Sequence, residues 1–195
     1  MPKTTIDQLH TDRSTNKIVT VSYAHHEVHD GNTFSCHYVQ DVTDTADRSV
    51  IAFTTPATKE IHMFALIAAT AAADFLVLEG ATALLPSAVD LTVYNRDRNS
   101  TNTSLMTSID GTVGKVSYYT LTTDTGISGG TEIYHEHIGA GKIGQAAAGA
   151  SRGTAEWILK KSTVYDFELK SLDANDNSHH IELTWYEHNN KHGGT

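Results

Sequence analysis

Residues 164–170 read VYDFELK and residues 180–186 read HIELTWY, and these two alternating stretches decide the fold. Because the side chains of a strand point alternately to opposite faces, a period of two predicts two strands, each with one buried face. The polar residues 172–178 between them predict a turn, and we expect an antiparallel hairpin. The side chains expected to face inward are apolar: Tyr165, Phe167, Leu169, Ile181, Leu183 and Trp185.

The rest of the chain repeats this pattern of short strands and polar turns, and no segment predicts a long helix. The segment 61–67 is apolar on both faces and predicts a strand buried on each side, whereas Ala68–Ala73 would also suit a helix. Asp30-Gly31 predicts a turn. The further strands are expected at residues 17–23, 33–39, 49–54, 75–78, 91–94, 105–109, 116–120 and 132–138, with a short apolar run at 154–159.

About ten short strands predict an all-β protein, an antiparallel β-sandwich or jelly roll. We expect residues 1–16 to form a flexible N-terminal arm, residues 17–190 a single sandwich domain and residues 191–195 a disordered tail. A chain of 195 residues suits one domain of this class.

Composition narrows the classes of function. The formal net charge is −9, which argues against nucleic acid as a partner because phosphates demand a basic surface. The apolar stretch from Ile61 to Ala73 is too short to span a bilayer, and we expect no membrane. Cys36 is the only cysteine, so an intramolecular disulfide is excluded. Its place in an alternating strand predicts a buried, unreactive thiol.

His135 and His137 form the sharpest candidate for chemistry. They stand two apart on a predicted strand, so both rings project from one face and could share a metal. The spacing resembles the first motif of the cupins, which are jelly rolls. The glutamate expected shortly after His137 is missing, because Gly141 and Lys142 stand there. We therefore favour a solvated or subunit-facing strand face over a metal site, and we expect no cofactor.

Nothing in the sequence predicts nucleophilic catalysis or nucleotide binding. The run 139–144 matches G-x-G-x-x-G, but the strand before it is half polar and the residues after it do not predict a helix. No G-x-S-x-G elbow is present. We expect the chain not to be an enzyme.

The densest polar segment is Asn95–Ser100, in which Arg96 and Arg98 bracket Asp97. Guanidinium groups bind carboxylates across interfaces, so these three residues are candidates for contact with a partner. The same segment also suits an internally bonded loop, since Asn and Asp stabilise turns. Both interpretations can hold together.

Several segments resemble a widespread family of tailed-phage virion proteins encoded near the major capsid protein. The resemblance rests on Tyr94–Thr101 (YNRDRNST), on Ala155–Lys160 (AEWILK), on the glycine-rich stretch 137–152 and on the closing Leu183–His188 (LTWYEH). It implies a β-sandwich that decorates the outer surface of the assembled head and stabilises it. It also implies the major capsid protein as partner, a homo-oligomer, most often a trimer, and a chain made in the host cytoplasm.

Two alternatives remain open at this point. One is a cupin-like metal-binding protein that uses His135 and His137. The other is a carbohydrate-binding module on a fibre, because sandwiches host lectins and Tyr118, Tyr119 and Tyr186 could stack on sugars if they are exposed.

Overall fold

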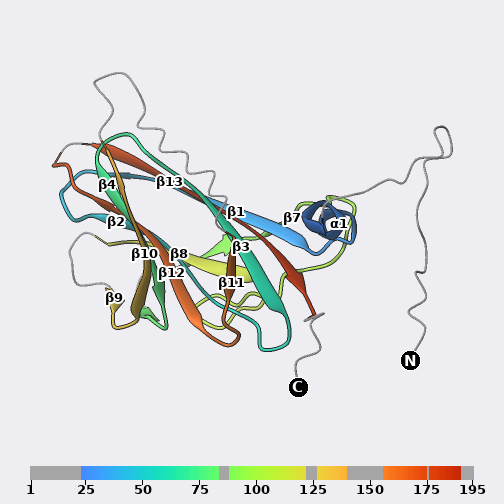
Figure 1. Cartoon of the computed structure of the whole chain (residues 1–195). Helices are drawn as coiled ribbons and strands as arrows, with labels where there is room; N and C mark the ends of the chain where they lie inside the picture. Colours follow the sequence, from blue (N-terminus) through green and yellow to red (C-terminus); the bar gives the residue numbers. More distant parts are fainter. Residues whose placement is uncertain (1–22, 84–87, 122–126, 140–155, 175, 190–195) are drawn as a thin grey trace, which may run out of the picture.

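The computed structural model describes residues 23–83, 88–121, 127–139, 156–174 and 176–189, and the arm predicted at 1–16 and the tail at 191–195 lie outside them. Two antiparallel sheets face each other in the described part, which confirms the β-sandwich (Figure 1). One sheet has five strands in the order β11-β3-β13-β1-β7, and the other has six in the order β10-β4-β12-β2-β8-β6. A short ribbon of two strands, β5 and β9, stands apart from them.

Most of the strands coincide with alternating segments of the sequence, and residues 17–22 of the strand predicted at 17–23 lie outside the described residues. The five-stranded sheet consists of β1 (Thr33–Val42), β3 (Glu60–Ala69), β7 (Tyr94–Asn95), β11 (Trp157–Leu159) and β13 (Asn177–His188). The six-stranded sheet consists of β2 (Arg48–Thr54), β4 (Ala73–Glu79), β6 (Val89–Thr92), β8 (Lys115–Leu121), β10 (Thr131–Ile138) and β12 (Val164–Ser171). The ribbon is β5 (Thr82–Ala83) with β9 (Ile127–Ser128), and the helix is α1 (Tyr23–His29).

The hairpin expected from residues 164–186 is not formed, although both strands are. β12 pairs with β2 and β4, whereas β13 pairs with β1 and β3 in the opposite sheet. The polar turn therefore crosses between the layers. Alternation specifies which face of a strand is buried, and both strands bury theirs in the same core from opposite sides. It does not specify which strand lies alongside.

The core lies between the two sheets and is built from the residues that alternate inward. Phe167, Leu183 and Trp185 are fully buried there, and Trp157 is partly buried against them. Cys36 is buried in the same cluster, as the alternation of its strand predicts, and burial raises the pKa of its thiol to about 12. A thiol held protonated in this way is not a nucleophile at neutral pH.

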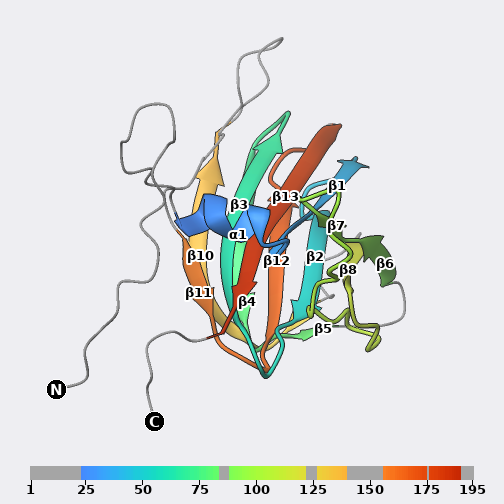
Figure 2. The same ribbon diagram turned by 90° about the vertical axis from the view of Figure 1, so that its right-hand side faces the viewer.

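A helix stands where the sequence predicted only a strand end and a turn. α1 lies over the outer face of the five-stranded sheet, close to β13 (Figure 2). Asp30-Gly31 closes this helix instead of a hairpin: the backbone N–H of Gly31 bonds to Val28 and that of Asn32 to Glu27, with Gly31 at φ 68°. This is the glycine-terminated helix end in which a left-handed residue satisfies the last carbonyls. A Cβ on Gly31 would lie 2.2 Å from Ser100 Oγ, so the backbone also approaches its neighbour too closely for any side chain.

Two further expectations are corrected, and one alternative is excluded. The strand predicted at 105–109 is absent, and only Thr107 makes isolated bridges, to Thr54 and Val113. The segment 68–73 contains the end of β3, a turn at 70–72 and the start of β4, so the helix that its composition would also suit is not formed. β3 is buried on its inner face only, and Phe64 and Leu66 are partly exposed on the outer one.

Candidate functional site

Three of the four segments on which the expected phage-protein resemblance rests contribute a residue to one row across the five-stranded sheet. Asn95 of β7 pairs with Phe34 of β1, which pairs with Trp185 of β13. Trp185 pairs with Met63 of β3, and Met63 pairs with Trp157 of β11. Five residues that lie as far apart in the chain as Phe34 and Trp185 therefore stand side by side at this end of the sheet.

The buried carboxylate of Glu187 ties this end together. It accepts hydrogen bonds from the Ser104 hydroxyl at 2.6 Å, from the Leu105 backbone N–H at 3.1 Å and from the Trp185 indole N–H at 3.1 Å. A buried carboxylate is tolerated only when donors compensate its lost hydration, and here three groups do so. The loop after β7 is thereby anchored to the closing strand.

The Asn/Arg segment is both an ordered turn and an exposed pair of cations. Asn95 Oδ1 accepts from the backbone N–H of Asp97, and Asp97 Oδ1 accepts from the backbone N–H of Asn99. Arg96 and Arg98 are exposed, and the Arg98 guanidinium stands 5.6 Å from the centre of the Tyr94 ring. The segment is therefore an internally bonded loop, and its two arginines are also free of burial and available for contact with a partner.

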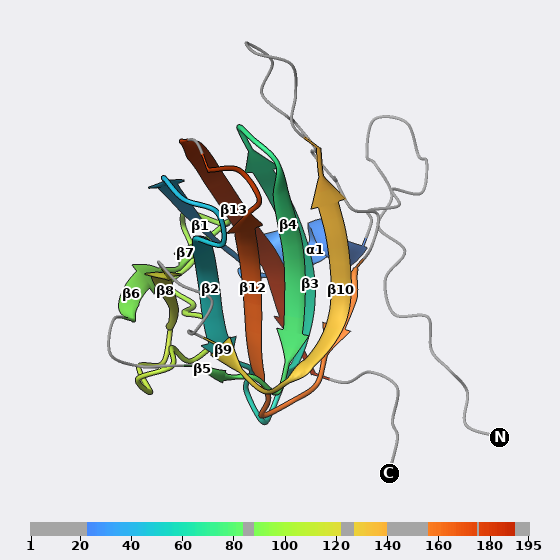
Figure 3. The ribbon, with the colours of Figure 1, turned by 90° about the vertical axis from the view of Figure 1, so that its left-hand side faces the viewer.

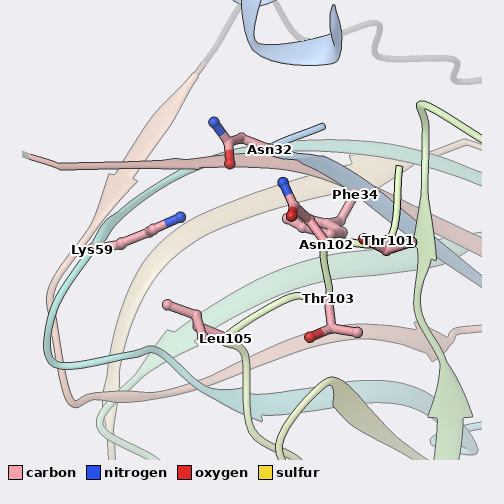
Figure 4. Close-up of a pocket in the computed structure, with 7 residues that line it drawn as sticks. All are labelled: Asn32, Phe34, Lys59, Thr101, Asn102, Thr103 and Leu105. Atoms are coloured by element: carbon pink, nitrogen blue, oxygen red, sulfur yellow. The ribbon is translucent and has the colours of Figure 1, made fainter. Parts of the chain in front are cut away.

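A pocket of about 430 Å³ opens beside this segment (Figure 4). Its lining is mostly polar, with one ammonium group from the loop between β2 and β3, and consists of Asn32, Phe34, Lys59, Thr101, Asn102, Thr103 and Leu105. Within the described ranges, the Lys59 ammonium has no hydrogen bond or ion pair. Amides, hydroxyls and one unpaired cation suit a polar or anionic group of a partner.

A cluster of histidine, glutamate and tyrosine side chains lies on the outer face of the same sheet. Glu60 pairs with His188, and His62 pairs with Tyr186, across the β3–β13 register. Because residues two apart share a face, all four side chains gather there. The ligand atoms of Glu60, His62 and His188 lie within 4.8 Å of one another. Scattered histidines in the sequence gave no hint of this, because the register between β3 and β13 is what brings them together.

Only one other group among the described residues satisfies the same condition, namely His26, Glu27 and Asp30 on and just after α1. The side chains of this second group already contact other polar side chains. The imidazole of His26 contacts Asp30 at 3.1 Å, and Glu27 accepts from the Asn32 amide at 3.1 Å. The cluster on β3 and β13 is therefore the stronger candidate for a metal site.

His135 and His137 project from one face of β10, as their spacing predicts, onto the outer side of the six-stranded sheet (Figure 3 shows this sheet). Both approach one carboxylate: Asp74 Oδ1 lies 3.4 Å from His135 Nε2 and 3.0 Å from His137 Nδ1. Asp74 was not anticipated, since it comes from the neighbouring strand β4. The three ligand atoms do not all lie within 4.8 Å of one another, unlike those of the β3–β13 cluster.

Two carboxylates expected on an exposed strand face are buried. Asp166 and Glu168 of β12 point to the outer side of the six-stranded sheet, yet neither is exposed. Glu168 accepts a hydrogen bond of 2.6 Å from Arg48. The carboxylate of Asp166 has no hydrogen-bond partner among the described residues. Burial, and then the nearby charge of Glu168, raise the pKa of Asp166 to about 7.

The aromatic residues proposed as a sugar-binding surface are not available for that role. Tyr119 and Tyr186 are buried, and Tyr118 is partly buried against the core. Tyr118 lies against Tyr38 of the core, Tyr119 packs with Val50 and Ala52, and the ring of Tyr186 stacks on His62. The G-x-G-x-x-G run lies, apart from Gly139, outside the described residues.

Comparisons with protein-family models, with curated proteins and with solved structures found no match to this chain. No helix in the described ranges has the length and apolar character needed to cross a membrane.

Proposed function

We propose that this chain is a structural protein of a tailed-phage virion, which binds the outer surface of the head through its major capsid protein and stabilises it. Binding is by surface complementarity and involves no catalysis. The described fold is the β-sandwich that the resemblance implies. The observation that carries the proposal is the row from Asn95 through Trp185 to Trp157, to which three of the four segments of the resemblance contribute a residue. The fourth segment, the glycine-rich stretch 137–152, lies outside the described residues from position 140 onward.

The surface beside this row has the features of a protein interface. Exposed guanidinium groups of Arg96 and Arg98 lie at its edge, and Tyr94 is exposed next to them. Arginine and aromatic residues are enriched at interfaces, where they bury large areas and bind carboxylates. On the outer face of the same sheet Ile158 is 64% exposed, and it adds an apolar contact.

The test is binding of the purified chain to heads assembled without it, measured by cosedimentation. We expect saturable binding and a higher temperature of head disruption. The double variant Arg96→Ala/Arg98→Ala should bind at least about tenfold more weakly, which corresponds to a loss of at least about 1.4 kcal/mol of binding free energy. Lys161→Ala is the matched control, because it removes an exposed positive charge from the turn between β11 and β12.

Failure to bind such heads, together with binding to purified tails or fibres, would place the chain elsewhere in the virion and refute head decoration. The oligomeric state is checked separately by light scattering. A trimer would have three times the 21.2 kDa of one chain.

A further inference from the structure

We infer that the cluster on the outer face of β3 and β13 is a divalent metal site, with Glu60, His62 and His188 as ligands of an ion such as Zn²⁺. This goes beyond the proposed function, and it holds or fails independently of what the chain binds in the virion. Histidine nitrogens with a carboxylate oxygen are a common donor set for zinc and its neighbours.

The geometry of the cluster carries the inference, since its three ligand atoms lie within 4.8 Å of one another, and the contacts of the two imidazoles support it. Nδ1 of His188 lies 2.8 Å from the carbonyl oxygen of Asn189, and a carbonyl only accepts, so Nδ1 carries the proton. Nδ1 of His62 contacts the Glu156 carboxylate, which also only accepts, and lies 3.0 Å from the Tyr186 hydroxyl. Because that hydroxyl donates its proton to Glu156, Nδ1 of His62 carries a proton as well. In each neutral ring the lone pair is therefore on Nε2.

These two Nε2 atoms face each other at 2.6 Å. Neither has a proton to donate when the rings are neutral, so two lone pairs meet at less than an ordinary N–H···N distance. Such an arrangement is repulsive unless a cation lies between or beside them. The Glu60 carboxylate Oε2 stands 3.9 Å from His188 Nε2, and Glu156 adds a second negative charge. Two carboxylates beside two neutral imidazoles leave a charge that one divalent ion balances.

The surroundings have the form of a built metal site. Ligating histidines usually donate their second N–H to a carboxylate or a carbonyl, which fixes the tautomer and the ring orientation. Glu156 and the Asn189 carbonyl do so here. Tyr186 donates its hydroxyl proton to Glu156 and stacks on His62 with ring centres 4.6 Å apart, which holds both side chains in place.

The geometry needs only a small adjustment to admit an ion. With Zn–N bonds of about 2.0–2.1 Å, two nitrogens of a tetrahedral site lie about 3.3 Å apart, so the Nε2 atoms must separate by about 0.7 Å. The side chains of His62 and His188 are each 12% exposed and that of Glu60 is 21% exposed, so the site is reachable from solvent. Three protein ligands leave one tetrahedral position open to water or to a donor from a partner.

The test uses the full chain without a purification tag, treated with chelator and then given ZnCl₂. We expect about one zinc per chain to remain after gel filtration, and Co²⁺ to give the visible absorption of a tetrahedral site. In His62→Ala and His188→Ala the dissociation constant for zinc should rise at least about 100-fold. Glu156→Gln, which removes a negative charge beside the site and weakens the support of His62 and Tyr186, should raise it about 10–100-fold.

His137→Ala and His180→Ala are the matched controls, since each removes an outward-facing histidine elsewhere and should leave zinc binding unchanged. Far-ultraviolet circular dichroism verifies that every variant is folded, and His188→Gln replaces His188→Ala if the latter is not. If the wild type retains neither zinc nor cobalt, the inference is overturned. A proton shared by the Nε2 atoms of His62 and His188 would then be the cation between them. Equal retention by the His62→Ala/His188→Ala double variant would overturn it too.

Discussion

The hydroxyl of Ser104 donates a hydrogen bond of 2.6 Å to the carboxylate of Glu187, 83 residues further along the chain, and both side chains are buried. This contact fixes the loop that follows the Asn/Arg segment to the end of the closing strand. The backbone N–H of Glu187 in turn bonds to the carbonyl of Asn32. The pocket, the exposed arginines and the histidine cluster therefore lie at the same end of the five-stranded sheet.

Replacing Glu187 by alanine should destabilise the protein by about 3 kcal/mol, because the donors from Ser104, Leu105 and Trp185 lose their acceptor in a buried place. The free energy of unfolding from urea denaturation measures this. Glu182→Ala is the control, since Glu182 lies on the outer face of the same strand and should change stability by less than about 0.5 kcal/mol. Equal effects of the two substitutions would contradict the role of Glu187.

Trp185→Ala should cost about 3–5 kcal/mol, because this side chain is fully buried between the sheets and its loss leaves a cavity. Tyr94→Ala removes an aromatic ring that is 45% exposed and should cost far less. Thermal and urea unfolding of both variants test the difference. A nearly neutral Trp185→Ala would mean that the inner face of β13 is assigned wrongly.

Stability should fall as the pH rises through neutrality because of Asp166. Burial and the charge of Glu168 raise the pKa of Asp166 to about 7, against about 3.9 in the unfolded chain. Between about pH 4 and pH 7 the folded protein keeps a proton that the unfolded chain releases, so this contribution to the free energy of unfolding declines as pH increases. The difference in the free energy of unfolding between Asp166→Asn and wild type should therefore be more favourable to the variant at pH 8 than at pH 5, by on the order of 2–3 kcal/mol.

The measurement is urea unfolding of wild type and Asp166→Asn at both pH values. Asp90→Asn, on the exposed strand β6, is the control and should show no such difference. A stability difference between Asp166→Asn and wild type that does not change with pH would refute the buried, protonated carboxyl.

His179 should act in the opposite direction. Burial lowers the pKa of its imidazole to about 4, and Asp47 opposes this shift. As pH falls from about 6.5 to 4 the unfolded chain binds a proton that the folded protein does not, so stability is lost over this range. His179→Gln should remove that loss. Relative to wild type, its free energy of unfolding should be about 2–3 kcal/mol more favourable at pH 4.5 than at pH 7.5. His180→Gln changes the outward neighbour and should track wild type.

Alternation in the sequence determined the class of fold and much of the core. The inward positions of β12 and β13 are predicted correctly, and so is the burial of Cys36. These features are local consequences of side-chain direction in a strand, and they need no knowledge of the partner strand.

Features that depend on long-range pairing escaped prediction. The assignment of β12 and β13 to opposite sheets rests on contacts with β2, β4, β1 and β3, which alternation does not encode. The helix α1 escaped because its glycine end reads equally as a turn. The burial of Asp166 likewise depends on what covers the outer side of the six-stranded sheet.

The sequence by itself determined an acidic, disulfide-free, all-β chain and named His135, His137, Arg96, Asp97 and Arg98 as candidates. Only the tertiary structure decided that Glu60, His62 and His188 form a cluster, because their nearest approach is set by the register of two strands more than a hundred residues apart. Side chains two apart on one strand share a face by local geometry alone. Which side chains then face them across the sheet is a property of the folded chain, since hydrogen bonding between backbones fixes the register.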